Sequence, residues 1–280
     1  MSDVSSLVST NWLAENLDDP NIRIFDSSWH MPAAGRNAKS EYDAAHIPGA
    51  LFFDVDEISD NANPLPHMMP IEEKMSRRLR KFGVSKGQHI IIYDNSNGLS
   101  AARGWYMFKT FGHEKVSILD GSLAKWTSEG HEVTSDIVSY SGSHYSAIKD
   151  AGATRTLEQL MENINTKTEQ VVDARSNGRF LGTDPEPRAE LKSGRIPNSF
   201  NLPFNTLMNE DKTFKTPADI KKSFEESGVN LNEPIITSCG SGMTACVLLF
   251  ALHQIGHKDN ALYDGSWTEW GGHPDTPVIK

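Results

Sequence analysis

CGSGMTA, residues 239–245, joins two apolar segments of different kinds. The run Pro234–Ser238 before it is typical of a buried strand, and Thr244–Leu252 after it is typical of a buried helix. Gly240 and Gly242 give the backbone between the two the freedom to turn tightly. The sequence therefore predicts a cysteine, Cys239, at a strand-to-helix turn in an α/β protein.

Such a turn favours the thiolate form of Cys239. Successive N–H groups of the turn point inward and form a nest for negative charge, and the following helix adds the positive end of its dipole. Because the thiolate is the nucleophilic form of cysteine, we expect Cys239 to be a nucleophile rather than a buried structural cysteine. Cys246 lies inside the apolar helix and is expected to pack.

The composition excludes several classes of protein. Among 280 residues, 38% are hydrophobic and 23% are charged, which is typical of a globular protein, and the net charge of −10 argues against a nucleic-acid partner. No apolar run approaches the length of a membrane span, so no membrane partner is expected. The N-terminus lacks a secretion or transit pattern, and two cysteines make no disulfide framework, so we expect a cytoplasmic protein.

The chain repeats itself. Three ordered pairs of segments match, with FGHEKVSILDGSLAKW (111–126) and IGHKDNALYDGSWTEW (255–270) sharing Gly-His, Asp-Gly-Ser and a final Trp at an offset of 256 − 112 = 144. The other pairs are IFDSS (24–28) with VVDAR (171–175), and HIPGALF (46–52) with RIPNSFN (195–201). The pattern indicates an internal duplication of a unit of roughly 130 residues.

Each half alternates apolar strands with helical patterns, which predicts a parallel sheet flanked by helices. In the first half, strands are expected over 22–26, 89–93 and 116–119, and helices over 10–17, 70–82 and 101–111. The polar, Ser/Gly-rich stretch 134–154 is interpreted as a linker between domains at 1–133 and 155–280.

The strand, the CGSGMTA loop and the helix together resemble the active-site region of the rhodanese sulfurtransferases, and among them the members that use 3-mercaptopyruvate. The resemblance covers nearly the whole chain and implies tandem rhodanese-like domains, each with a parallel-sheet core flanked by helices. It implies that Cys239 takes sulfur from a small-molecule donor as a persulfide, releases pyruvate, and passes the sulfur to a thiol or to cyanide. Thioredoxin is the protein thiol acceptor that the family suggests.

The two halves differ at the loop itself. Aligning IIIYDN with IITSCG places Asp94 opposite Cys239, and a carboxylate cannot carry sulfur. We therefore expect the first half to be catalytically silent and to contribute one wall of an interdomain cleft. The sequence contains no metal-binding motif such as CxxC or HExxH, and neither a metal nor a cofactor is expected.

The resemblance also assigns the substrate-binding groups. Arginines matching Arg179 and Arg188, in GRFLGTDPEPR, hold the substrate's carboxylate and ketone in the family, as guanidinium groups do. The alternative is a pair of loop arginines that bind the neighbouring carboxylates of Asp184, Glu186 or Glu190. The loop residues expected to surround the substrate are Gly240, Gly242, Met243 and Thr244.

Three further residues match a proton relay in the family. Ser241, His67 and Asp56 would form a serine–histidine–aspartate chain that returns a proton when sulfur departs. The alternatives are a loop-forming serine, an interface histidine and a surface aspartate. The tryptophans in or beside helical patterns are expected in the core: Trp105, Trp126, Trp267 and Trp270.

Other functions stay open at this point. Thiosulfate is an alternative donor, although family members that prefer it tend to carry basic residues after the cysteine, where this chain has the neutral Gly240 and Ser241. A cysteine phosphatase would need an arginine six residues after the nucleophile, where this chain has Ala245. A non-catalytic binding or sulfur-carrier module is the alternative from a different class.

Overall fold

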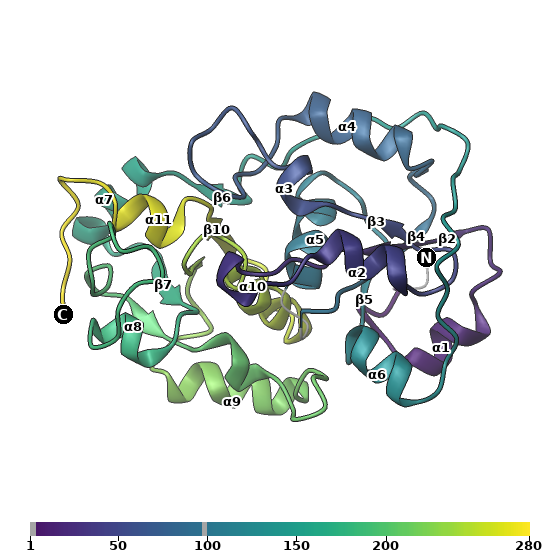
Figure 1. Ribbon diagram of the computed structural model, residues 1–280. Helices are drawn as coiled ribbons and strands as arrows, with labels where there is room; N and C mark the ends of the chain where they lie inside the picture. The colour runs from purple at the N-terminus through teal and green to yellow at the C-terminus, as the bar shows by residue number, and fades with distance from the viewer. Residues whose placement is uncertain (1–3, 97–99) are drawn as a thin grey trace. The chain divides into compact units, whose positions relative to one another are not determined.

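The computed structural model describes residues 4–96 and 100–280 (Figure 1). The structure does not describe residues 1–3 or residues 97–99. The N-terminal stretch that lacks a targeting pattern begins with residues 1–3, so this part of the prediction lies outside the described residues. The chain divides into two compact units of three segments each. Unit 1 comprises Met1–Asp60, Pro70–Asp150 and Glu210–Phe214; unit 2 comprises Asn61–Met69, Ala151–Asn209 and Lys215–Lys280.

Each unit contains a short segment from the opposite half of the sequence. Residues 61–69 belong by their contacts to unit 2, and residues 210–214 belong to unit 1. The sequence pattern gives no sign of this exchange, because it depends on contacts between residues far apart in the chain. The domain limits 1–133 and 155–280 stay predictions.

Unit 1 is built on a five-stranded parallel sheet of order β1-β5-β4-β2-β3. Its strands are β1 (Leu7–Val8), β2 (Ile22–Asp26), β3 (Leu51–Phe52), β4 (His89–Tyr93) and β5 (Val116–Leu119). Its helices are α1 (Thr10–Glu15), α2 (Ala38–Ala44), α3 (Val55–Ile58), α4 (Glu72–Lys81), α5 (Ser100–Thr110) and α6 (Ser122–Ser128). The three strands predicted for this half have the observed limits.

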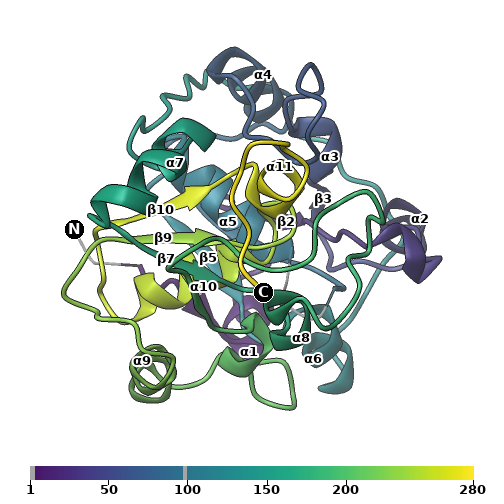
Figure 2. The same ribbon diagram turned by 90° about the vertical axis from the view of Figure 1, so that its left-hand side faces the viewer.

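Unit 2 repeats this topology with a parallel sheet of order β6-β10-β9-β7-β8. Figure 2 shows its central strands β10, β9 and β7 side by side. Its strands are β6 (Thr154–Arg155), β7 (Gln170–Asp173), β8 (Phe200–Asn201), β9 (Ile235–Ser238) and β10 (Asn260–Tyr263). Its helices are α7 (Leu157–Thr166), α8 (Asn177–Leu181), α9 (Pro217–Glu226), α10 (Ala245–Gln254) and α11 (Ser266–Trp270). The predicted fold class and the duplication are confirmed, since each strand has a counterpart in the same position of the other sheet.

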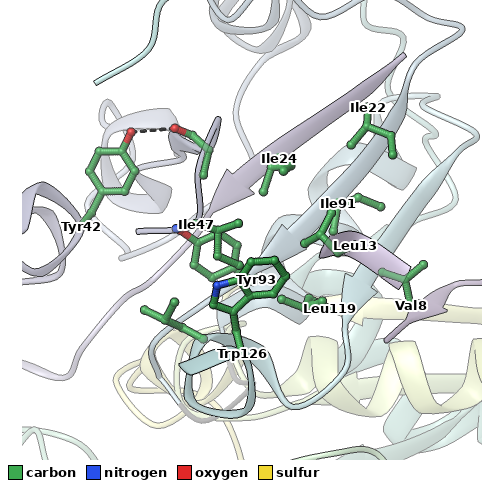
Figure 3. Close-up of a cluster of buried hydrophobic side chains, with 12 residues drawn as sticks. Val8, Leu13, Ile22, Ile24, Tyr42, Ile47, Ile91, Tyr93, Leu119 and Trp126 are labelled. Carbon is green, nitrogen blue, oxygen red and sulfur yellow. Dashed lines mark hydrogen bonds between the residues drawn. The ribbon is translucent and has the colours of Figure 1, made fainter. Parts of the chain in front are cut away.

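Aliphatic and aromatic side chains of the central strands form the core of each unit. Figure 3 shows this for unit 1, where Ile24 and Ile91 lie near Tyr93 and Trp126, and where the Tyr42 hydroxyl donates a hydrogen bond of 2.8 Å to the Ala50 carbonyl. Burying side chains of this size contributes roughly 1.5–3 kcal/mol each. The four tryptophans predicted for the core are all buried.

The polar stretch predicted to be a linker belongs to unit 1 up to Asp150. The Arg80 Nε donates to the Tyr145 carbonyl at 2.7 Å, and the Ala147 N–H donates to the Ser76 hydroxyl at 2.9 Å. Tyr145 is buried. Most of the predicted linker is therefore held in place by side chains of α4 and the residues near it.

Candidate active site

Cys239 follows β9 directly, at the carboxyl end of the parallel sheet of unit 2. Its thiol is free and buried, with 1% of the residue exposed. The chain then turns through Gly242, whose φ of +78° is a left-handed conformation that favours glycine, and enters α10 at Ala245. This is the strand–turn–helix arrangement predicted from the sequence.

Ser266, at the start of α11, holds the shape of the cysteine loop. Its Oγ accepts hydrogen bonds from the N–H groups of Cys239 at 3.2 Å and Gly242 at 3.1 Å, and it donates to the Tyr263 carbonyl at 2.8 Å. The same oxygen lies 4.0 Å from the Cys239 Sγ. The backbone of Ser266 is strained, because its φ is +49°. The three hydrogen bonds of its hydroxyl group fix the side chain.

The loop turns its first carbonyl groups toward α11. The Trp267 N–H donates to the Cys239 carbonyl at 2.9 Å, and the Thr268 N–H donates to the Gly240 carbonyl at 2.8 Å. In the part of the chain that the structure describes, no protein acceptor takes a hydrogen bond from the N–H groups of Gly240, Ser241, Met243 or Thr244. These donors therefore remain available to an anionic group at Cys239.

Arg179, on α8, lies against the cysteine loop. A methyl group added to Gly240 would lie 3.3 Å from the Arg179 Nη2, so the absence of a side chain at residue 240 permits this approach. Arg179 also pairs with Glu186 at 2.6 Å, and Glu186 pairs with the fully buried Arg175 at 2.8 Å. The pairing of Arg179 with a neighbouring carboxylate is therefore observed, and this partner fixes the guanidinium group beside the loop. Binding of the substrate by Arg179 stays a prediction.

Arg188 reaches the same loop through Thr268. Its Nη1 lies 3.5 Å from the Thr268 Oγ1, which donates a hydrogen bond of 2.6 Å to the Gly240 carbonyl. Arg175 is stacked on the Trp267 ring at 4.0 Å and is paired with Asp173. The guanidinium groups of Arg179 and Arg188 thus both lie close to the cysteine loop. The residue that follows Cys239 in this loop is Gly240, which has no side chain.

The structure places the three relay residues on different elements. Ser241 is buried in the cysteine loop, 7% exposed, and His67 is buried in the segment 61–69 of unit 2, 6% exposed. Asp56 lies on α3 of unit 1, where its Oδ2 accepts a hydrogen bond of 2.9 Å from the Trp29 Nε1. The relay through all three stays a prediction.

Comparison with known proteins matches both halves of the chain. The model of the rhodanese-like domain family matches residues 9–129 and again 156–273. The chain belongs to the rhodanese-like family.

Named relatives extend over almost the full length of the chain. It is 41% identical to the 3-mercaptopyruvate sulfurtransferase of Mus musculus, with 95% of this chain and 91% of the relative covered. It is also 41% identical to thiosulfate/3-mercaptopyruvate sulfurtransferase 1, mitochondrial, of Arabidopsis thaliana, with 97% and 77% covered. The crystal structure of SseA from Escherichia coli, described as a 3-mercaptopyruvate sulfotransferase, superimposes with a TM-score of 0.86 at 38% identity over 94% of this chain and 99% of that one.

The first rhodanese-like repeat has a carboxylate, that of Asp94, at the position of Cys239. Asp94, fully buried after β4, accepts hydrogen bonds from the N–H groups of Ser96 at 2.8 Å and Ala101 at 2.7 Å. The Asp94 N–H donates to the Ser122 hydroxyl at 2.7 Å, as the Cys239 N–H does to Ser266. Unit 1 therefore has, at the position of the Cys239 thiol, a buried carboxylate that accepts two backbone N–H groups of its own unit.

Burial also raises the pKa of a second carboxyl group in unit 1, that of Asp26. Asp26, at the end of β2, has its pKa raised to about 6, chiefly by burial, although hydrogen bonds from Ser28 oppose the shift and the charge of Asp94 adds to it. An uncompensated carboxylate at this place costs stability at neutral pH.

Sequence reasoning missed Ser266, Thr268 and the bridging role of Glu186. Ser266 is the serine of the second Asp-Gly-Ser triplet, so the repeat contained a signal for it. Thr268 carried no such signal. Glu186 was one of the three carboxylates expected to bind a loop arginine, but nothing in the sequence indicated its second pair with Arg175. In the described ranges, no group of three or more His, Cys, Asp or Glu is arranged to hold a metal ion, and no helix is long and apolar enough to cross a bilayer.

Proposed function

We propose that this protein moves sulfur from 3-mercaptopyruvate, through a persulfide on Cys239, to a thiol or cyanide acceptor and releases pyruvate. The observation that carries the proposal is the buried thiol of Cys239 in a loop where the N–H groups of Gly240, Ser241, Met243 and Thr244 have no acceptor among the described residues. A thiolate and a persulfide are both anions, so one loop stabilises the resting and the loaded enzyme.

The chemical step needs a proton at carbon. The Cys239 thiolate attacks the substrate sulfur, a sulfur–sulfur bond forms, and the carbon–sulfur bond breaks with its electron pair on carbon. The resulting enolate of pyruvate takes one proton to become the methyl ketone, and the thiol proton of the substrate is released as the persulfide ionises. One sulfur atom is transferred and no oxidant or reductant is required.

Arg179 and Arg188 are proposed to bind the carboxylate and ketone of the substrate. Arg179 is fixed by Glu186 and lies beside Gly240, and Arg188 lies against Thr268, whose hydroxyl is bonded to the Gly240 carbonyl. Guanidinium groups held in this way lose little conformational freedom on binding a carboxylate. The loop residues Gly240, Gly242, Met243 and Thr244 are proposed to surround the sulfur. Of these, Gly242 donates its N–H to Ser266.

Ser241, His67 and Asp56 are proposed to deliver the proton to the enolate. General acids of this kind contribute roughly 10²–10⁴-fold to rate. Ser241 adjoins the loop donors, and His67 lies in the segment that belongs to unit 2. Asp56 would fix the histidine tautomer, as in other relays of this type.

Thiosulfate is the second candidate donor, and the relative from Arabidopsis thaliana carries both donors in its name. Thiosulfate has no carboxylate for the two arginines, and Gly240 and Ser241 offer it no charge next to the nucleophile. Both features favour 3-mercaptopyruvate. We further propose a cytoplasmic location and thioredoxin as a protein acceptor. These rest on the family resemblance, and one relative is mitochondrial by name.

The test is a comparison of kcat/KM for the two donors with cyanide or dithiothreitol as the acceptor. We expect 3-mercaptopyruvate to be preferred at least tenfold. A preference for thiosulfate would reverse the assignment of the donor. Failure of both acceptors to draw sulfur from the protein would favour a non-catalytic binding module.

A further inference from the structure

Two aspartates at matching places of the repeat each hold a segment from the opposite half of the sequence. In unit 1, the Asp120 Oδ1 accepts a hydrogen bond of 2.9 Å from the Phe214 N–H. In unit 2, the Asp264 Oδ2 accepts one of 2.6 Å from the Met69 N–H. The two aspartates are separated by 264 − 120 = 144 residues, the offset of the Asp-Gly-Ser triplets.

The Met69 and Phe214 N–H groups are counterparts, since each donates to the aspartate of its own unit. Counted at the same offset of 214 − 69 = 145, His67 corresponds to Lys212, and the two share a left-handed backbone, with φ of +62° and +68°. The His67 side chain is buried, at 6% exposure, whereas Lys212 is partly exposed. The unit with the catalytic cysteine therefore contains a buried histidine where the silent unit contains a partly exposed lysine.

The Asp264–Ser266 triplet contacts both the cysteine loop and the segment that contains His67. Its serine fixes the cysteine loop by accepting the N–H groups of Cys239 and Gly242, and its aspartate fixes the segment that contains His67. His67 has a φ of +62°, a conformation that a residue with a side chain keeps only when its surroundings hold it. The Met69 N–H bond, two residues further on, is one such restraint.

We propose that Asp264 is a positioning residue for His67, setting the histidine relative to Cys239 through the Met69 N–H. This inference rests on the proposed role of His67 in delivering a proton. It goes beyond that role, because Asp264 acts on the backbone and is distinct from Asp56, the aspartate expected to fix the tautomer.

A comparison of the two sulfur donors shows whether Asp264 positions His67 or only supports the fold. Transfer from 3-mercaptopyruvate leaves an enolate that must take a proton at carbon. Transfer from thiosulfate forms the same sulfur–sulfur bond and releases sulfite with the electron pair of the broken bond, so no proton is needed. A displaced His67 should therefore slow the first reaction and spare the second.

The experiment measures kcat/KM for both donors, with its pH profile, in Asp264→Ala, Asp264→Asn, His67→Ala and the double alanine variant of the full chain. Asp120→Ala is the matched control, since it removes the same kind of bond around the silent loop. Asp264→Asn keeps an acceptor oxygen for the Met69 N–H and covers the case in which the alanine variant folds poorly.

We expect Asp264→Ala to lower kcat/KM for 3-mercaptopyruvate about ten- to a hundredfold, as misplacement of a catalytic group does, and to leave thiosulfate within about threefold. Asp264→Asn should retain most activity, Asp120→Ala should behave as wild type with both donors, and the double variant should be no slower than His67→Ala. The inference is overturned if both donors lose equally, or if the losses of the two single variants multiply. Failure of the proposed function is a separate result, namely wild-type protein that does not use 3-mercaptopyruvate.

Discussion

Ser266→Ala should disable the cysteine loop, whereas Ser122→Ala should affect only stability. Ser266 accepts two backbone N–H bonds, from Cys239 and Gly242, and an unsatisfied buried donor costs about 1–3 kcal/mol. The free energy of unfolding should therefore fall by at least about 2 kcal/mol. Ser122 accepts one such bond, from Asp94, and its loss should be about half as large.

The loss of function should be confined to one of the two variants. Without the Ser266 hydroxyl, the N–H groups of Cys239 and Gly242 lose the acceptor that fixes the loop around the sulfur. A misplacement of about 1 Å costs about a hundredfold in rate. Single-turnover formation of the persulfide, followed by intact-mass spectrometry of quenched samples, measures this directly, and urea unfolding of both variants supplies the stability comparison. Equal loading rates in the two variants would refute the assignment of Ser266 to the loop.

Four further predictions concern specificity and pH. Arg188→Ala should lower kcat/KM more for 3-mercaptopyruvate than for thiosulfate, because only the former has a carboxylate; equal losses would contradict the binding role. Ser241→Lys should raise the thiosulfate-to-mercaptopyruvate ratio, since unit charges ~4 Å apart at an effective dielectric of ~20 attract by about 4 kcal/mol before desolvation. Gly240→Arg should instead impair both donors, because its side chain meets Arg179. Asp26→Asn should stabilise the protein by about 3 kcal/mol at pH 8 and by little at pH 3.5. The pKa of Asp26 is raised from 3.8 to about 6 in the folded state, so the wild type loses stability as pH rises through that range. Urea titrations of both proteins at the two pH values measure the difference in the free energy of unfolding.

Local sequence patterns predicted much of the architecture. The strands β2, β4 and β5 have the expected limits, and α10 begins one residue after the predicted start at Thr244. Alternation of short apolar runs with helical patterns is a local property, and the duplication provided each pattern twice. The position of Cys239 at a strand-to-helix turn follows from the same local evidence.

The contacts that organise the site were not predictable in the same way. The exchange of residues 61–69 and 210–214 depends on hydrogen bonds to Asp264 and Asp120, whose partners lie 195 and 94 residues away in the chain. The bridging of Arg175 and Arg179 by Glu186 is equally a property of the folded loop. The sequence named Glu186 among three possible carboxylate partners of the loop arginines, but nothing in it indicated the pair with Arg175.

The most direct test of the account is the mass of the protein after treatment with 3-mercaptopyruvate. Wild type should gain one sulfur atom, located on Cys239 by peptide mapping, and should release one equivalent of pyruvate. Cys239→Ser should gain none, while its far-ultraviolet circular dichroism stays that of wild type. A Cys239→Ser protein that still gains sulfur, or a wild-type protein that carries it on Cys246, would contradict the central role of the CGSGMTA loop.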